Sequence, residues 1–298
     1  MNDIPRKLSY ALLGAFTLAG LLLRAYGLQE SLWLDELHTA WVVTGGVNEL
    51  PVRAEMGNCH ATYFYLVWAS VNTFGIHEWS LRLPAIVAGT GLIPLMFSAT
   101  RQWTKSRLAA LLAAGLVAMD PWCIVFAQEA RVYALLQWVG LLQLLMLWRV
   151  LKKPRLTNRI AMVGLSALLF YLHFTSLLFF VAEWLFGLYV CLRYSRRNRY
   201  AISQLLFDTL LIVAAMLPAW SLLSEIAARR SNWELFVPVP TGLQVFRLFP
   251  LDLHVLAPLF LVGCVTVWNL FLKKTENRRR IPLLIWLLTA TWFLVPIA

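Results

Sequence analysis

Two adjacent carboxylates, Asp35 and Glu36, stand among apolar residues in the stretch 31–40. A positioned carboxylate can take a proton from a hydroxyl group and so act as a general base. A charged side chain near a bilayer is also costly, which makes an acidic pair there a candidate functional site. The alternative is a solvated loop that happens to be acidic.

A second stretch, 126–133, reads Phe-Ala-Gln-Glu-Ala-Arg-Val-Tyr. It carries a third candidate catalytic acid, Glu129, and the arginine Arg131. A guanidinium can meet the charge of a phosphate with two parallel hydrogen bonds. Arg131 is therefore the best candidate to bind a phosphate, with Arg82 and Arg229 behind it. The alternative for Arg131 is an ion pair with Glu129 or a contact with a lipid head group.

A third set of side chains could bind a substrate beside these acids: His60, Tyr133, His173 and Trp233. His173 closes the Tyr-Leu-His stretch at 171–173, and its alternative is a hydrogen-bonded histidine at the membrane interface. Trp233 could stack on a bound substrate, although tryptophan is common at membrane interfaces in any case.

The composition places these residues in a membrane protein. Hydrophobic residues make up 60% of the 298 positions, and the mean hydropathy is +0.68, whereas soluble domains are about 45–50% apolar. The net charge of +11 comes mostly from short basic clusters between apolar runs. Such clusters are typical of cytoplasmic loops and not of a nucleic-acid surface.

The basic clusters predict an all-α, polytopic transmembrane bundle of about nine spans. If all five clusters are cytoplasmic, an even number of spans separates consecutive clusters. The clusters lie at 6–7, 101–107, 149–159, 193–199 and 273–280. The predicted spans are 8–28, 81–100, 108–122, 132–148, 160–173, 174–192, 201–222, 253–272 and 281–298.

Two sizeable outer loops follow from this topology, 29–80 and 223–250. The aromatic, apolar stretch 61–75 is too short to cross and is predicted to lie as an interfacial helix in the first loop. Eleven of the 15 acidic residues, and all five histidines, then lie outside or at the outer end of a span. The positive-inside rule does not require that bias, and an outward polar cavity would explain it.

Together the three chemical stretches resemble the GT-C superfamily of membrane glycosyltransferases, the group of the protein O-mannosyltransferases and aminoarabinose transferases. The resemblance covers about residues 8–240, and the Arg-Leu-Pro at 82–84 supports it. It implies transfer of a sugar from a polyprenyl-phosphate donor to a lipid, glycan or protein acceptor outside the cytoplasm. It also implies a multi-pass protein of the plasma or inner membrane, with the active site on the extracytoplasmic face.

The family pattern assigns roles to individual acids. The first acid of the pair carries the chemistry, which implies Asp35 as the catalytic base or a metal-linked acid and Glu36 as secondary. The acid of the second outer loop maps onto Glu129, and a divalent metal held by Asp35 and Glu129 is left open. The family often has His-Pro-Pro before the aromatic helix, whereas Ala61 follows His60 here; the role of His60 is therefore left open.

A lipid or solute transporter is the alternative function, because a polytopic bundle with buried acids fits it as well. Transporters often show internal repeats, and the sequence shows none. A structural scaffold would leave the outward acid bias unexplained. We expect one membrane domain over 1–298; the apolar run at its end has no polar tail, which leaves an incomplete C-terminus open.

Overall fold

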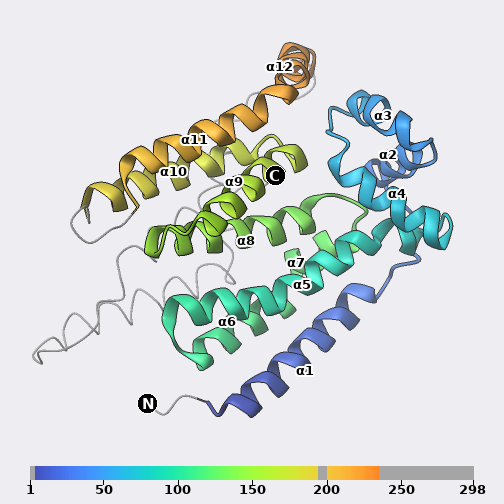
Figure 1. Ribbon diagram of the computed structural model, residues 1–298. Helices are drawn as coiled ribbons and strands as arrows, with labels where there is room; N and C mark the ends of the chain where they lie inside the picture. Colours follow the sequence, from blue (N-terminus) through green and yellow to red (C-terminus); the bar gives the residue numbers. More distant parts are fainter. Residues whose placement is uncertain (1–3, 194–199, 235–298) are drawn as a thin grey trace, which may run out of the picture. The chain divides into compact units, whose positions relative to one another are not determined.

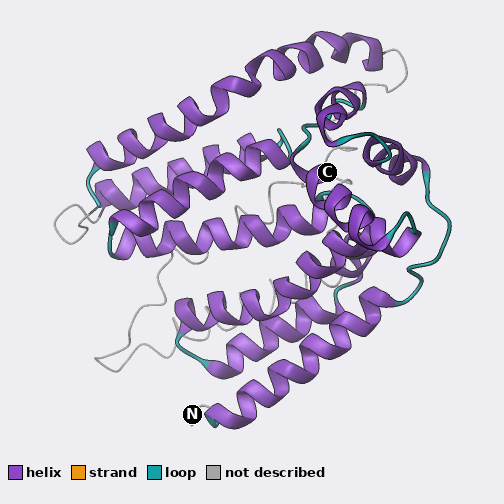
Figure 2. Ribbon diagram, turned by 45° about the vertical axis from the view of Figure 1, so that its right-hand side comes forward, coloured by secondary structure: helices purple, strands orange, loops and turns teal. Residues whose placement is uncertain are grey.

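The computed structural model describes residues 4–193 and 200–234, and every regular element in these ranges is a helix (Figure 2). The predicted spans 253–272 and 281–298 lie outside the described residues. The elements are α1 (Arg6–Ala25), α2 (Leu34–Val43), η1 (Val47–Glu49), α3 (Leu50–Met56), α4 (Thr62–Phe74), α5 (Glu78–Thr104), α6 (Arg107–Met119), α7 (Pro121–Gln128), α8 (Tyr133–Lys152), α9 (Leu156–Leu172), α10 (Ser176–Arg193), α11 (Ile202–Met216), η2 (Leu217–Ala219) and α12 (Trp220–Glu234).

The all-helical prediction is confirmed over the described residues, and the count of nine spans is not. Within these ranges four helical segments are long and apolar enough to cross a membrane, or five if the bent pair α6 and α7 forms one span. The four are α1, α5, α8 and the segment Ile202–Ala228. α9 and α10 are apolar but shorter. The chain is thus a multi-pass membrane protein by length and composition.

The predicted span 108–122 corresponds to α6, and α7 follows it at a bend of 53°. The break falls at Asp120 and Pro121, because proline lacks the N–H that would continue the helix. Asp120 then begins α7 as its N-cap, and its side chain accepts a hydrogen bond from the backbone N–H of Cys123 at 2.7 Å. The apolar run therefore continues to Gln128, past the predicted end.

Arg24 of α1 sits at this break and is completely buried. Its guanidinium donates to the carbonyl oxygens of Val117 at 2.9 Å and Ala118 at 3.1 Å, in the last turn of α6. The last carbonyls of a helix have no partner within it, and a cation there is favourable. The cost of burying Arg24 is thereby offset by carbonyl groups that the bend leaves free.

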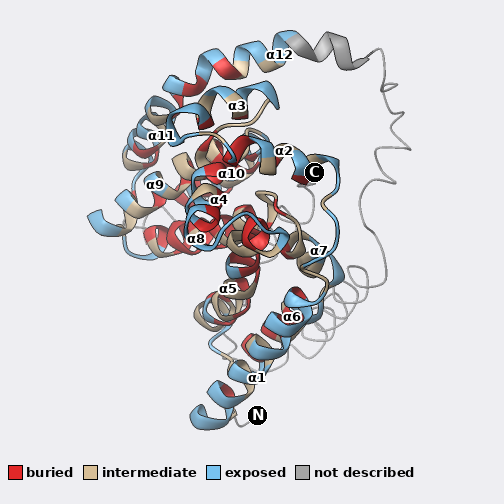
Figure 3. Ribbon diagram, turned by 90° about the vertical axis from the view of Figure 1, so that its right-hand side faces the viewer, coloured by how far each residue is buried: buried red, intermediate tan, exposed pale blue. Residues whose placement is uncertain are grey.

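α5 is the helix that most of the first half of the chain packs against, since α1, α4, α6, α7 and α8 all contact it (Figure 1). Small residues allow the close approach: Ala85, Ala88, Ala127 and Ala134 form a buried cluster. At Gly89 an added Cβ would lie only 2.5 Å from the Cβ of Ala127. α8 is the most buried of the candidate spans, and Figure 3 shows buried residues gathered along it.

The first predicted outer loop, 29–80, folds into α2, η1, α3 and α4. α4 has 13 residues, which is too short to cross a bilayer of about 20 helical residues, and it is not among the candidate spans. Ser70 of α4 donates to the carbonyl of Ser80 in α5 at 2.6 Å, across a turn made possible by Gly75 at φ 85°. This turn returns the chain from α4 into α5.

A buried ion pair joins α9 to α11. Arg159 makes three hydrogen bonds to Asp208, the shortest at 2.6 Å, and the hydroxyl of Tyr200 donates to the same carboxylate at 2.6 Å. The chain divides into two compact units, Met1–Ile226 and Ala227–Ala298. The second contributes only the end of α12 to the described residues, so the predicted loop 223–250 is helical as far as it is described.

Candidate active site

α2 places the acidic pair in its first turn, directly after Trp33. Negative charge is favourable at a helix N-terminus, where the first backbone N–H groups have no partner in the helix. The two carboxylates enter different surroundings: Glu36 is completely buried, whereas the side chain of Asp35 is 42% exposed. Neighbouring side chains on a helix diverge by about 100°, which is why only one of them faces outward.

Glu36 is held on every side by hydrogen-bond donors. Nε and Nη2 of Arg82 donate to its two oxygens at 2.8 and 2.7 Å, and the backbone N–H of Ala130 donates at 2.7 Å. The backbone N–H of Trp33 adds a longer bond of 3.3 Å. Burial alone would raise the pKa of Glu36, but the hydrogen bonds from Arg82 and Ala130 bring it below its usual value. Glu36 is thus a buried anchor that is ionised at neutral pH.

The N–H groups of Arg82 donate to Glu36 and to nearby backbone carbonyls. They are therefore not available for the phosphate-binding role predicted for Arg82. Besides Glu36, its Nη1 donates to the carbonyls of Leu28 and Glu30, both at 2.9 Å. Its Nη2 also lies 3.5 Å from the carbonyl of Ser31. A guanidinium has five N–H groups in a fixed fork, and these contacts occupy the fork completely. Arg82 is 5% exposed and fastens the start of the first outer loop to α5.

Asp35 faces Arg131 instead. Nη2 of Arg131 lies 3.6 Å from Oδ2 of Asp35, and its Nη1 donates to the backbone carbonyl of Asp35 at 3.4 Å. The alternative partner considered for Arg131 from the sequence was Glu129. The close pair found here joins α2 to the connector between α7 and α8, across 96 positions of the chain. It brings a half-exposed carboxylate and a guanidinium together outside the candidate spans.

Glu129 begins that connector and is half-buried. Burial raises the pKa of Glu129, and the negative charges of Glu36 and Asp35 raise it further, against the opposing charge of Arg131. The environments of Glu36 and Glu129 thus move the two carboxyl pKa values in opposite directions. Such divergence is typical of sites that assign different roles to neighbouring acids.

Aromatic and imidazole rings border Arg131. The ring of Tyr133 lies 5.9 Å from the guanidinium carbon of Arg131, 5.3 Å from Phe126 and 6.4 Å from His173. His173 is fixed through Nδ1 by the hydroxyl of Thr175 at 2.7 Å. Burial lowers the pKa of His173, and the charge of Arg131 lowers it further. The predicted substrate residues Tyr133 and His173 therefore lie beside the Asp35–Arg131 pair.

His60 lies beside a different residue. Its ring packs edge-on against Tyr171 of α9 at 4.6 Å between ring centres, and its Nδ1 is 2.7 Å from the hydroxyl of Thr62. Burial lowers the pKa of His60. The contact joins the first outer loop to the end of α9. A direct contact of His60 with a substrate stays a prediction.

Two residues that sequence reasoning missed belong to the same site, Tyr63 and His38. Tyr63 is buried, its pKa is raised by burial, and the charges of Arg131, Glu36 and Glu129 act on its hydroxyl. His38 packs against Phe64, and its pKa is lowered by burial and by Arg131. The only signal in the sequence was that Tyr63 begins the aromatic stretch that we interpreted as interfacial.

Three buried polar atoms at this site have no hydrogen-bond partner in the part of the chain that the structure describes. They are Nε of Arg131, the hydroxyl of Tyr63 and Nε2 of His38. A buried polar atom without a partner costs about 1–3 kcal/mol. These unpartnered polar atoms surround the Asp35–Arg131 pair. A site that binds a polar ligand would use such atoms to form hydrogen bonds with that ligand.

The other predicted site residues fall elsewhere. Arg229 and Trp233 belong to α12 by their backbone, and their side chains lie outside the described residues. Over the described ranges no group of three or more His, Cys, Asp or Glu side chains is placed to hold a metal ion. Asp35 and Glu129 share their surroundings with Arg131, whose charge opposes a divalent cation. The residues present therefore do not fit the metal left open from the family pattern.

Residues 53–130 match the family model of dolichyl-phosphate-mannose-protein mannosyltransferase. The predicted resemblance to GT-C glycosyltransferases is confirmed over these residues. The comparison with curated proteins found no match, and neither did the comparison with solved structures.

The mannosyltransferase match covers about a quarter of the chain, from α3 to the connector after α7. It includes Arg82 and Glu129 but ends one residue before Arg131, and it begins after Asp35 and Glu36. It indicates a membrane glycosyltransferase. The structure adds that α2 brings the acidic pair from outside the matched range against residues at its end.

Proposed function

We propose that the chain transfers a sugar from a polyprenyl-phosphate donor to a hydroxyl-bearing acceptor, at a site on the extracytoplasmic face of the plasma or inner membrane. The observation that carries the proposal is the pair of Asp35 and Arg131, 3.6 Å apart and accessible beside an otherwise buried anchor. It unites a base and a phosphate-binding cation, the two groups this reaction needs. The mannosyltransferase match supports the reaction class.

Asp35 acts as the general base. The acceptor hydroxyl gives its proton to the Asp35 carboxylate while its oxygen forms a bond to the anomeric carbon of the donor sugar. The bond from that carbon to the phosphate oxygen breaks, and the polyprenyl phosphate leaves with the electron pair. A positioned base of this kind contributes about 10²–10⁴-fold in rate.

Arg131 meets the charge of the lipid phosphate. Its Nε has no partner among the described residues, its contacts with Asp35 are long, at 3.4 and 3.6 Å, and Tyr133 lies beside the guanidinium. The guanidinium can therefore turn one edge to a phosphate and keep Asp35 within reach. Stabilising the leaving group as its charge develops is the larger electrostatic part of such catalysis.

Glu129, Tyr133 and His173 would hold the sugar between these two groups. Glu129 can accept a hydrogen bond from a sugar hydroxyl, and the ring of Tyr133 offers an apolar face beside Arg131. The unpartnered hydroxyl of Tyr63 supplies a further polar contact. No step of this proposal passes through a metal, because the positive charge of Arg131 beside Asp35 opposes a divalent cation there.

The transporter alternative has no observation in its favour. Its binding residues would lie in the middle of discontinuous spans. Asp35 lies in the first turn of the ten-residue α2, and Glu129 lies in the connector that follows α7. Both are at helix ends, which supports a site at the membrane surface.

The test is a transfer assay with the purified protein and a panel of polyprenyl-phosphate sugars. We expect one donor of the panel to give sugar transfer to an added acceptor and release of the polyprenyl phosphate in equal amount. A protein that moves the intact lipid across vesicles and transfers no sugar from any donor would be a transporter, and the proposal would be wrong.

A further inference from the structure

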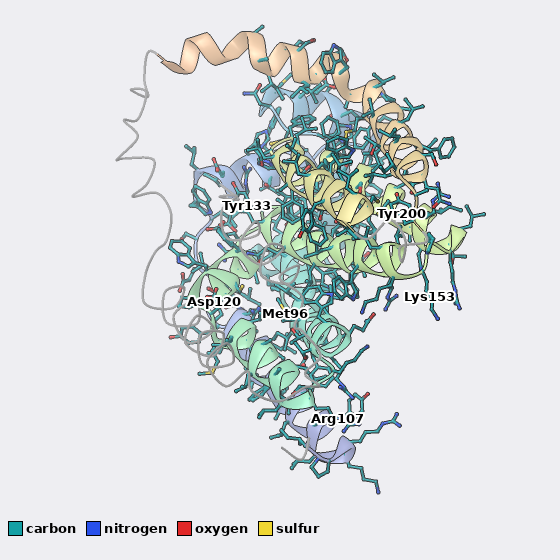
Figure 4. All side chains as sticks on the ribbon, turned by 90° about the vertical axis from the view of Figure 1, so that its left-hand side faces the viewer. Met96, Arg107, Asp120, Tyr133, Lys153 and Tyr200 are labelled. Carbon is teal, nitrogen blue, oxygen red and sulfur yellow. The ribbon has the colours of Figure 1, made fainter. Side chains whose placement is uncertain are left out.

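A second cluster of charge lies at the far ends of α5 and α8. The two helices pack together and start beside the candidate active site, at Glu78 and Tyr133. Figure 4 shows Tyr133 and Lys153 at opposite ends of α8. A helix of 20 residues is about 30 Å long, so the cluster lies about that far along α8 from the candidate active site. It takes no part in the proposed sugar transfer.

The turn that follows α5 presents one lysine of this cluster. Lys105 has the left-handed backbone conformation, with φ 64°, which is uncommon outside glycine. Its backbone N–H donates to the carbonyl of Arg101 at 3.1 Å, and the guanidinium of Arg101 donates back to the carbonyl of Lys105. The backbone of Lys105 is thus fixed at a turn, and the residue is exposed there.

The end of α8 supplies the other groups. The ammonium of Lys152 lies 4.2 Å from the ring centre of Trp148, one helical turn earlier. Trp148 is only 7% exposed, and its indole N–H is buried without a partner in the described residues. Nε of Arg149 donates to the side chain of Gln102 at 3.0 Å, which fastens this end of α8 to α5.

Two lysines of the cluster lack a carboxylate partner among the described residues, Lys105 and Lys152. Arg159 of the stretch 149–159, by contrast, pairs with Asp208. Lys105 follows Gln102 by three residues, and Lys152 follows Arg149 by three residues, so the contact between Gln102 and Arg149 brings both lysines to the same end of the α5–α8 pair. Two ammonium groups at one end of a helix pair, with the unpartnered indole N–H next to Lys152, offer only hydrogen-bond donors and positive charge, which is what an anion binds.

We propose that Lys105, Lys152 and Trp148 bind the phosphate of an anionic phospholipid. The two lysines would meet its charge, and the indole N–H of Trp148 would donate to a phosphate oxygen. A lipid is favoured over a free anion because the site is at the end of two candidate spans, where head groups and acyl chains are both within reach. Basic pockets between transmembrane helices recognise lipid head groups in this way.

The full chain, purified in neutral detergent, provides the test through its unfolding temperature. We expect added phosphatidylglycerol to raise the unfolding temperature, while phosphatidylcholine and inorganic phosphate at equal concentration leave it unchanged. Each lysine near a lipid surface is worth about fivefold in affinity, so the double variant K105Q/K152Q should need about 25-fold more phosphatidylglycerol for the same shift. Trp148→Phe keeps an aromatic ring but removes the indole N–H. It should weaken the shift less than K105Q/K152Q does.

The matched control is R6Q/K7Q, which removes two positive charges at the start of α1, outside the cluster. It should keep the wild-type response to phosphatidylglycerol. The proposal is overturned if the control loses as much affinity as K105Q/K152Q, because net charge alone would then explain binding. It is also overturned if phosphatidylcholine or inorganic phosphate alone reproduces the shift. If the double variant does not fold, the exposed Lys105→Gln alone should show the fivefold loss.

Discussion

Oε1 of Glu36 accepts hydrogen bonds from Nε of Arg82 at 2.8 Å and from the backbone N–H of Ala130 at 2.7 Å. The buried carboxylate of Glu36 thereby links α2 to α5 and to Ala130, which lies between Glu129 and Arg131. The acid next to the proposed base is therefore a positioning residue. It determines where the groups of the site stand without touching a substrate.

Removing this anchor should destabilise the protein. Breaking a buried ion pair by changing one partner costs about 3–5 kcal/mol, because the other charge stays buried without compensation. We expect Glu36→Gln and Arg82→Met each to lower the unfolding temperature strongly in detergent. Glu49→Gln is the control, since its pair with Arg53 is on the surface and such pairs contribute about 0–1 kcal/mol. Equal unfolding temperatures for Glu36→Gln and Glu49→Gln would contradict the anchor role.

The same anchor predicts a pH dependence of stability. The pKa of Glu36 is lowered in the folded protein, so its contribution is fully present above the unfolded value of about 4.3. It is lost as the pH falls from there through the lowered folded pKa. The difference in unfolding temperature between wild type and Glu36→Gln should therefore narrow between pH 5 and pH 3. A difference that stays constant over this interval would mean that Glu36 is not the group responsible.

Glu129 should show the opposite behaviour. Its pKa is raised in the folded protein, so keeping it ionised at neutral pH destabilises the fold. Glu129→Gln should raise the unfolding temperature at pH 7 and lower the transfer rate, a trade of stability for function. The gain in unfolding temperature should vanish as the pH falls below about 4.3, where the carboxyl is protonated in both states. A loss of stability at pH 7 would show that the carboxylate is needed for folding.

Arg131 is expected to act on the donor. Arg131→Lys keeps one charge and loses the planar fork, so it should raise the KM for the polyprenyl-phosphate sugar about tenfold or more. Arg53→Lys serves as the matched control, because Arg53 also lies in the outer segment but pairs with Glu49 on the surface. An unchanged donor KM in Arg131→Lys would remove Arg131 from the phosphate site.

The sequence predicted the parts of the fold that depend on local patterns. The apolar runs located α1, α5 and α8 to within a few residues, because a transmembrane helix needs a long uninterrupted apolar stretch. The predicted span 108–122 ends close to the break at Pro121, but the short helix α7 that follows was not predicted. The sequence stays apolar on both sides of Pro121, but α6 ends before this residue because proline has no backbone N–H to continue the helix.

The structure brings five of the predicted site residues close together: Asp35, Glu129, Arg131, Tyr133 and His173. Their roles stay predictions. The role of Arg82 was misjudged because its partner Glu36 lies 46 positions away, and no local pattern specifies such a pairing. The separation of the two adjacent acids, one buried and one exposed, likewise depends on what α2 packs against.

The most direct test of the account is the transfer rate of Asp35→Asn with saturating donor and acceptor. The substitution keeps the shape of the side chain and removes the base, so turnover should fall about 10²–10⁴-fold while the unfolding temperature stays at the wild-type value. Glu55→Gln, an exposed acid of the same outer segment, should transfer sugar at the wild-type rate. An Asp35→Asn protein that turns over as fast as wild type would contradict the assignment of Asp35 as the catalytic base.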